Sequence, residues 1–181
     1  MEFNNIKSDY LLVLDAHGVV FNNPLKDFFK DLAKDTQTEY EDLWGRWREK
    51  YRTPFWEGKL TSNKLWTEIA PEKDPQELEQ NLLLRYTTGP IYDSLINSSR
   101  PACLFSNHQS QWLLPRLKKF RIEDRFEHII VSDKIKAAKP SNKAFDALVK
   151  ITGTKKLFLI DDSPYNIEAA IAYGIQAYLQ K

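Results

Sequence analysis

The sequence predicts an α/β fold in which a parallel sheet carries an inserted helical region. Five short apolar runs have the length of buried strands, and amphipathic helical patterns separate the last four of them. Between the first and second runs, residues 22–98 contain several amphipathic stretches and no convincing strand. Strands that alternate with helices imply right-handed crossovers and a parallel sheet with helices on both faces.

The predicted elements follow from these patterns and from the turn residues between them. The strands are expected at residues 10–14, 101–105, 128–131, 157–160 and 176–179. The helices that follow the later strands are expected at 109–119, 141–151 and 163–173. Helices in the insert are expected at 24–33, 38–51, 62–69, 75–86 and 91–97, with breaks at Thr53-Pro54, Gly58, Pro71 and Gly89-Pro90. We therefore expect an α/β core domain of residues 1–21 and 99–181 and a helical cap domain of residues 22–98.

The composition restricts the kind of partner. The 181 residues include 26 basic and 25 acidic side chains, and a formal charge of +1 argues against nucleic acid or an anionic membrane as partner. The composition is compatible with a small neutral or anionic ligand, and the sequence does not indicate the oligomeric state. The single cysteine, Cys103, cannot form an intrachain disulfide and is expected to be a buried thiol. Residues 1–9 contain no apolar segment and no stretch is as long as a membrane span, so we expect a cytoplasmic protein.

Polar residues that could take part in catalysis or binding stand at or after the ends of four of the five predicted strands. They are Asp15, Ser106, the loop of residues 132–139 with Lys139, and the pair Asp161-Asp162. Ligands of open parallel sheets bind outside the carboxyl ends of the strands. One aspartate in such a position is as easily a helix cap or a turn residue. Four such positions together predict a functional site around Asp15.

These residues occur in four motifs. The first is an apolar strand that leads into Asp15-Ala16-His17-Gly18, and the second is a strand that ends in Ser106-Asn107. The third is Lys139-Pro140, and the fourth is Asp161-Asp162 with Asn166 shortly after it. In order, spacing and strand context the chain resembles the haloacid dehalogenase-like (HAD) hydrolase superfamily. The resemblance is to the branch with a helical cap inserted after the first strand (C1-type cap) on a Rossmann-like parallel sheet.

The resemblance implies a magnesium-dependent phosphatase that acts on a small-molecule phosphate monoester. Asp15 is then the nucleophile that forms an aspartyl-phosphate, which water hydrolyses. Mg²⁺ is held by Asp15, the backbone carbonyl of His17 and Asp162, with Asp161 and Asn166 supporting these ligands. The phosphoryl oxygens are held by side chains and backbone amides, which are expected at Gly18, Ser106, Asn107 and Lys139. Lys139 also favours the ionised form of Asp15.

His17 departs from the motif of the phosphatases in this family, which have an aspartate as acid and base two residues after the nucleophile. In one interpretation His17 performs this role as an imidazole that titrates near neutrality. In the other the acid/base function is lost, and the domain is a slow enzyme or a silent binding domain. If His17 is a poor proton donor, aryl and acyl phosphates should be better substrates than sugar phosphates. His108, close to the second motif, is a further candidate for substrate contact.

The same branch also contains haloacid dehalogenases, which use no metal and have no aspartate at the position of His17. The first motif therefore leaves a metal-independent dehalogenase open. Two adjacent acids at the end of a strand repel each other unless a cation or hydrogen bonds offset the charge. The pair Asp161-Asp162 therefore favours Mg²⁺ as cofactor.

Overall fold

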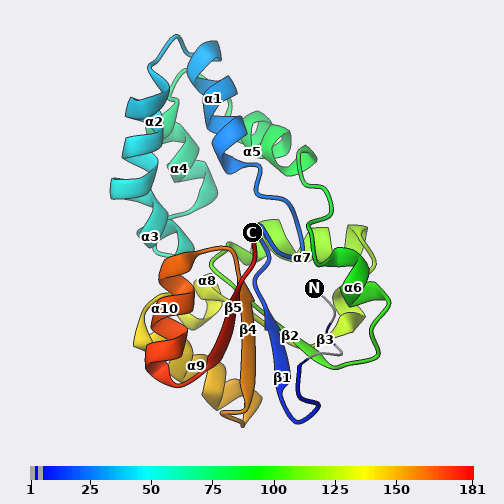
Figure 1. Ribbon diagram of the computed structural model, residues 1–181. Coiled ribbons are helices and arrows are strands. Elements are labelled where there is room, and N and C mark those ends of the chain that lie inside the picture. The colour runs from blue at the N-terminus through cyan, green and yellow to red at the C-terminus, as the bar shows by residue number, and fades with distance from the viewer. Residues whose placement is uncertain (1–2, 4–5) are drawn as a thin grey trace.

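A computed structural model describes residue 3 and residues 6–181 of the chain, and it has the predicted α/β fold (Figure 1). The strands are β1 (Leu11–Leu14), β2 (Ala102–Ser106), β3 (Phe126–Val131), β4 (Leu157–Asp161) and β5 (Gln176–Leu179). They form one parallel sheet in the order β3-β2-β1-β4-β5. All five predicted strands are confirmed. Residues 1–2 and 4–5 of the predicted core domain lie outside the described residues.

Most helices also lie where the sequence predicts them. The insert contains α1 (Leu25–Asp35), α2 (Tyr40–Arg46), the π-helix η2 (Trp47–Tyr51), α3 (Arg52–Trp56), α4 (Ser62–Ile69), α5 (Pro75–Leu84) and α6 (Tyr92–Ile96). The later segments are α7 (Ser110–Lys119), the short 3-10 helix η3 (Glu123–Arg125), α8 (Ser132–Ile135), α9 (Asn142–Thr152) and α10 (Pro164–Tyr173). The helical insert after β1 is thus confirmed.

Two local predictions were wrong. A break was expected at Thr53-Pro54, but the chain passes from η2 into α3 and Pro54 is the third residue of that helix. Proline lacks an N–H and disturbs the i→i−4 pattern of a helix, and the π-helical turn η2 directly before α3 is where that pattern changes. The third strand was expected to begin at residue 128, but β3 already begins at Phe126, so His128 lies inside the strand. The short helix α8 was not predicted.

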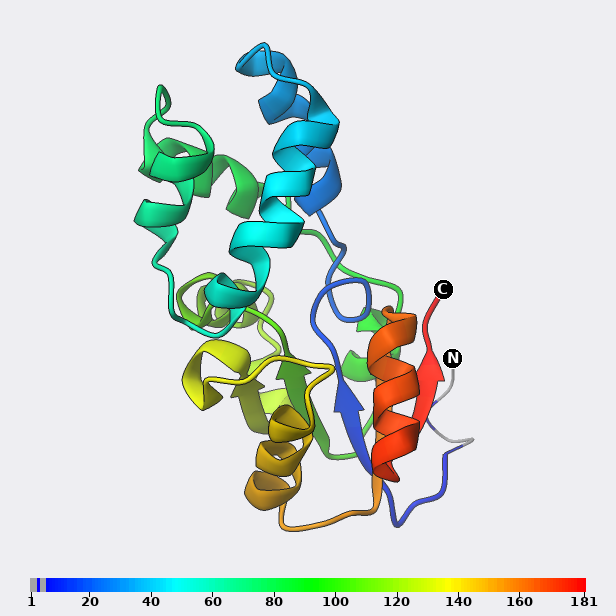
Figure 2. The same cartoon turned by 90° about the vertical axis from the view of Figure 1, so that its left-hand side faces the viewer.

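Side chains of alternating residues in the central strands point to opposite faces of the sheet, and each face has its own helices. Leu12 and Leu14 belong to a buried cluster that includes residues of α6 and α7. Val13, between them, belongs to a second cluster with residues of α9 and α10. Figures 1 and 2 show these helices on the two sides of the sheet. The continuous apolar runs therefore arise from burial on both faces.

The insert has an aromatic core of its own, which also contacts α7. Phe29, Trp47, Phe55 and Trp66 are almost completely buried in this cluster, together with Trp112 from α7. The rings of Trp66 and Trp112 are stacked with centroids 5.9 Å apart. The insert is thereby packed against the core domain, above the carboxyl ends of the strands (Figure 2).

The last part of the insert packs with the sheet instead. Tyr86, Ile91 and Leu95 lie in the same buried cluster as Leu12 and Leu14 of β1. The domain boundaries at residues 21/22 and 98/99 stay a prediction, and this packing favours a cap whose own core is formed by α1–α5.

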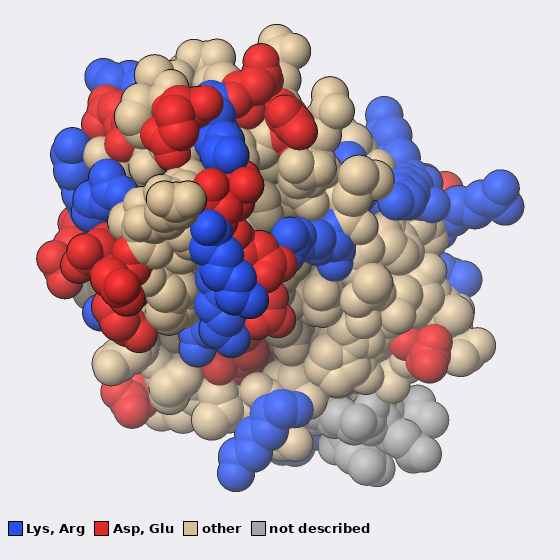
Figure 3. Space-filling view, turned by 90° about the horizontal axis from the view of Figure 1, so that it is seen from above, with Lys and Arg blue, Asp and Glu red and all other residues tan. Residues whose placement is uncertain are grey.

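The surface carries both signs of charge. On the face seen in Figure 3, basic and acidic side chains intermingle. Exposed ion pairs of the protein include Lys30–Asp27 and Lys73–Asp35. Among the described residues, no helix has the length and apolar character needed to cross a bilayer.

Candidate active site

The strand order brings the four motifs to one edge of the sheet. The central strand β1 pairs with β2 on one side and with β4 on the other, and Leu14 is in register with both Leu104 and Ile160. Asp15 therefore follows β1 directly beside the end of β4, and its amide donates to the Ile160 carbonyl at 3.0 Å. The connections reverse direction between β1 and β4, which is where open α/β sheets form their ligand sites.

Three carboxylates meet at this point. Oxygen atoms of Asp15, Asp161 and Asp162 lie within 4.8 Å of one another, and Asp162 is the most exposed of the three. Asp161 is fully buried and accepts hydrogen bonds from the Asn166 amide, at 2.9 and 3.1 Å, and from the backbone N–H of Ser163. These bonds hold Asp161 in place. Among the described residues, no other side chain donates a hydrogen bond to the carboxylate of Asp162, which accepts one from its own backbone N–H, so lone pairs of its oxygens remain open to a cation.

Lys139 is the buried cation of the site. Its ammonium group donates to Asp15 Oδ1 at 3.0 Å, to Asp161 Oδ2 at 2.6 Å and to the carbonyl of Phe105 at 2.7 Å. Burial by itself lowers the pKa of Lys139, but the carboxylates of Asp15 and Asp161 outweigh burial and leave the pKa raised. Lys139 is therefore charged at neutral pH and links the ends of β1, β2 and β4.

The site still has an excess of negative charge. Burial raises the pKa of Asp15 to about 7, although Lys139 acts in the opposite direction. The pKa of Asp162 is also raised, first by its partial burial and then by the neighbouring Asp161. Three carboxylates facing one ammonium group favour a second cation, and an all-oxygen set suits a hard divalent ion such as Mg²⁺.

Gly18 is required by the geometry of this cluster. It has φ of +73°, and an added Cβ would lie 2.1 Å from Oδ2 of Asp162. Glycine thus permits both the left-handed turn and the close approach of the carboxylate. The amide of Gly18 donates to the Phe21 carbonyl at 2.7 Å. In this conformation the amide is not free for the phosphate contact expected from the sequence.

Ser106 and Asn107 follow β2 and have different environments. The hydroxyl of Ser106 is buried and has no hydrogen-bond partner in the described part of the chain. A buried hydroxyl without a partner is costly, and a bound phosphoryl oxygen would satisfy it. The side chain of Asn107 instead exchanges two hydrogen bonds with the backbone of Lys139, at 2.7 and 2.8 Å. Asn107 therefore positions the loop that carries Lys139.

His17 lies in a buried polar group of three side chains. Nε2 of His17 contacts the Tyr86 hydroxyl and lies 3.2 Å from Nε2 of His108. The Tyr86 hydroxyl lies 3.0 Å from Nε2 of His108. Burial, and then His108, hold the pKa of His17 well below its usual value. Burial likewise lowers the pKa of His108 to about 4. Both imidazoles are therefore neutral at physiological pH.

Sequence reasoning missed Tyr86 as a residue of the site. It follows α5, and 69 residues separate it from His17. No motif surrounds it, and its aromatic character is equally typical of a core position. His108 was a candidate, and it lies just before α7 with its ring completely buried.

Residues of the cap cover the site. The carbonyl of Trp56 accepts a hydrogen bond from Ser132 Oγ at 2.5 Å, and the carbonyl of Phe55 accepts one from the side chain of Gln109. The ring of Trp56 lies 5.5 Å from that of His108, between centroids. Asp15 is only 7% exposed.

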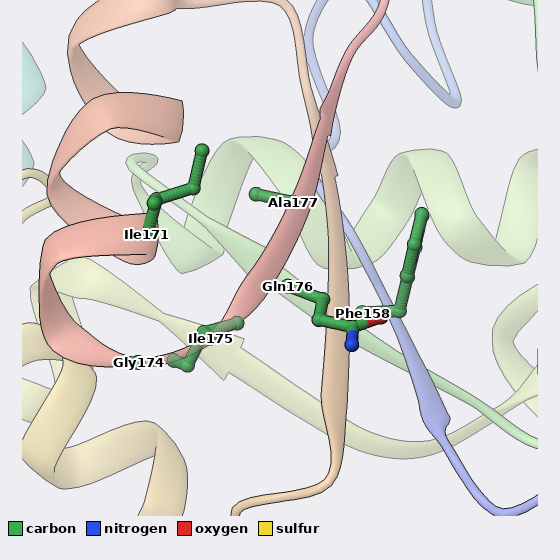
Figure 4. Close-up of a pocket in the computed structure, with 6 residues that line it drawn as sticks. All are labelled: Phe158, Ile171, Gly174, Ile175, Gln176 and Ala177. Carbon is green, nitrogen blue, oxygen red and sulfur yellow. The ribbon is translucent and has the colours of Figure 1, made fainter.

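Two surface hollows lie away from the acidic cluster. The first, at the β4–β5 edge of the sheet, is formed by residues of β4, α10 and β5 (Figure 4): Phe158, Ile171, Gly174, Ile175, Gln176 and Ala177. The second lies between α4, α5 and α7 and is lined by residues such as Ser62, Glu79 and Gln111. Neither contains any of the candidate site residues.

Comparisons with known proteins agree with this fold. Residues 91–179 match the family model of the haloacid dehalogenase-like hydrolases, a range that contains the second, third and fourth motifs. A HAD family enzyme of Bacteroides thetaiotaomicron has a solved structure with TM-score 0.78 and 24% identity, covering 97% of this chain and 95% of that chain. An aspartate-to-alanine variant of that enzyme, in complex with magnesium and inorganic phosphate, has TM-score 0.76 and 22% identity, covering 95% and 94% of the two chains.

A further solved structure belongs to a dehalogenase. The L-2-haloacid dehalogenase of Xanthobacter autotrophicus has TM-score 0.67 and 14% identity, covering 92% of this chain and 75% of that chain. A search of curated proteins returned no match.

The fold and the matches together define a capped α/β protein with a five-stranded parallel sheet and a helical insert after β1. Residues 91–179 match the haloacid dehalogenase-like hydrolases, and the chain as a whole shares the fold of the HAD family enzyme of Bacteroides thetaiotaomicron.

Proposed function

We propose that the protein is a magnesium-dependent hydrolase of small-molecule phosphate monoesters, with Asp15 as nucleophile. The observation that carries this proposal is the arrangement of Asp15, Lys139 and Asp162 at the junction of β1 and β4. It combines a carboxylate nucleophile, a buried cation and a second open carboxylate. The complex of the Bacteroides thetaiotaomicron enzyme with magnesium and phosphate supports the choice of ligand.

In the proposed reaction an oxygen of Asp15 attacks phosphorus and the bond to the leaving oxygen breaks, which gives an aspartyl-phosphate and the leaving group as an anion, a phenolate or carboxylate for aryl or acyl phosphates, which leaves without a proton from the protein. Water then adds to phosphorus, the bond to Asp15 breaks, and inorganic phosphate leaves. Lys139 holds Asp15 in place and offsets charge on the phosphoryl oxygens. The free hydroxyl of Ser106 donates to one of these oxygens.

Asp15, Asp162 and the backbone carbonyl of His17 would hold Mg²⁺, with Asp161 and Asn166 fixing the arrangement from behind. The ion supplies Lewis-acid stabilisation of the phosphoryl oxygens and offsets the excess negative charge of the three carboxylates. We assign Asp161 a supporting role and not that of a ligand, because its oxygens already accept hydrogen bonds from Lys139 and Asn166.

The proposed substrate class follows from the presence of a histidine, instead of an aspartate, at position 17. A buried neutral imidazole has no readily available proton for a poor leaving group. We therefore propose that aryl and acyl phosphates, whose leaving groups need little protonation, are better substrates than sugar phosphates.

The test is the release of inorganic phosphate from an aryl phosphate and from a sugar phosphate, with and without magnesium. Wild type and Asp15→Asn are compared, because asparagine keeps the size of the side chain but removes the nucleophilic charge. Turnover that requires magnesium and is lost in Asp15→Asn supports the proposal. Turnover of haloacids that is unaffected by a chelator would instead support a metal-independent dehalogenase. If wild type is inactive and His17→Asp gains activity, the natural role is that of a silent binding domain.

A further inference from the structure

The hydrogen bonds around His108 define where its proton lies. Nδ1 of His108 is 2.9 Å from the backbone nitrogen of Gln109 and 3.0 Å from the carbonyl oxygen of the same residue. The Gln109 carbonyl already accepts the amides of Trp112 and Leu113, both at 3.0 Å, in the first turn of α7. In the described chain the buried N–H of Gln109 has no acceptor other than this nitrogen. Since buried amides are almost always paired, Nδ1 of His108 accepts and its Nε2 carries the proton.

This assignment orders the rest of the group. The Nε2–H of His108 donates to the Tyr86 oxygen at 3.0 Å, and the Tyr86 hydroxyl donates its own proton to Nε2 of His17. A neutral imidazole whose Nε2 accepts must carry its proton on Nδ1. Among the described residues, Nδ1 of His17 has no hydrogen-bond partner. The ring therefore has one donor that the protein leaves unused.

We propose that Tyr86 and His108 are positioning residues that hold His17 as the neutral Nδ1–H tautomer, so that His17 offers a hydrogen-bond donor to the phosphorylated ligand. His17 then stabilises charge on a ligand oxygen without giving up a proton. The role of His17 as a donor to the ligand rests on the proposed phosphatase function. The order of the hydrogen bonds among His17, Tyr86 and His108 does not depend on that function. The proposed preference for leaving groups that need no protonation follows from this order of hydrogen bonds.

Nuclear magnetic resonance of the ring nitrogens tests the proposal directly, since protonated and unprotonated imidazole nitrogens have well separated ¹⁵N shifts. The chain has three histidines, so His17 can be assigned by comparison with His17→Gln. We expect a protonated Nδ1 and an unprotonated Nε2 in wild type at neutral pH. A protonated Nε2, with or without a proton on Nδ1, would overturn the proposal.

Tyr86→Phe removes the hydroxyl that selects the tautomer and keeps the ring. We expect both tautomers to appear, so that the donor population and kcat on an aryl phosphate fall by about twofold or more. Tyr92→Phe is the matched control, because the Tyr92 hydroxyl donates to the Phe120 carbonyl at 3.0 Å, in a contact that includes none of the site residues. It should leave the shifts of His17 unchanged. His108→Gln, which keeps a donor near Tyr86, should preserve the Nδ1–H form better than His108→Leu.

Titration with inorganic phosphate in the presence of magnesium tests the contact with the ligand. The Nδ1–H resonance of His17 should shift as phosphate binds, whereas the resonances of His128 should not. Phosphate binding without a shift of Nδ1 would refute the role as donor. An Nδ1–H signal in a protein without phosphatase activity would support the hydrogen-bond order and refute the proposed function, so the two failures are distinguishable.

Discussion

The contact between Gly18 and Asp162 allows a quantitative test of the metal site. In Gly18→Ala the new Cβ would lie 2.1 Å from Oδ2, 2.5 Å from Cγ and 2.8 Å from Cβ of Asp162. Because the clash includes Cβ of Asp162, rotation of the carboxylate alone cannot relieve it. The alanine must also keep φ near +73°, which costs about 1–2 kcal/mol. We expect Asp162 to be displaced and the affinity for Mg²⁺ to fall at least about tenfold, or ~1.4 kcal/mol.

Gly153→Ala is the matched control. Gly153 has φ of +69° at the end of α9, and an added Cβ would meet no atom within 4 Å. The two variants therefore share the backbone cost, about 1–2 kcal/mol, and a chain of this size loses about 2–4 °C in Tm for each kcal/mol. The difference between them isolates the clash with Asp162.

The assay is thermal unfolding with and without magnesium, supported by calorimetric titration. At a magnesium concentration about 100 times the Kd of wild type, binding stabilises wild type and Gly153→Ala by ~2.7 kcal/mol. A tenfold weaker site gives ~1.4 kcal/mol at that concentration, so the gain in Tm should be about 3–5 °C smaller in Gly18→Ala. If both variants gain the same stability from magnesium, Asp162 is not a ligand and the reasoning is refuted.

Three further variants or conditions test the rest of the site. Lys139→Met should destabilise the protein by about 3–5 kcal/mol in urea unfolding at neutral pH, since it leaves Asp15 and Asp161 buried without their cation; a loss below about 1 kcal/mol would contradict the ion-pair assignment. Magnesium affinity measured by calorimetry should rise with pH up to about 7 and then level off, because protonated Asp15 cannot bind the ion; a flat profile would count against Asp15 as ligand. Ser106→Ala should leave the free energy of unfolding within about 0.5 kcal/mol of wild type, or raise it, since the hydroxyl has no partner. Phosphate binding should nevertheless weaken, and unchanged phosphate affinity would exclude Ser106 as a contact.

Much of the fold was predictable because it depends on local patterns. The central strands of a parallel sheet are buried on both faces, so they appear as continuous apolar runs, and β1 and β4 were found in this way. The candidate residues Asp15 and Asp161 were found because both stand directly at the ends of such runs. Parallel strands bring their carboxyl ends to one edge, so the convergence of these residues did not depend on details of packing.

Contacts between distant side chains were not predictable from such patterns. Tyr86 meets His17 across 69 residues, and no periodicity records which buried aromatic ring has its hydroxyl beside an imidazole. The sequence predicts that the amide of Gly18 contacts the phosphate, and it does not reveal that the turn after β1 returns to Phe21, whose carbonyl accepts this amide. The residues that end the strands are thus specified by local burial and topology. The protonation and hydrogen-bond partners of His17 depend on how the cap and α7 pack together above the sheet, because burial and partner geometry, not the residue type, determine where an imidazole proton lies.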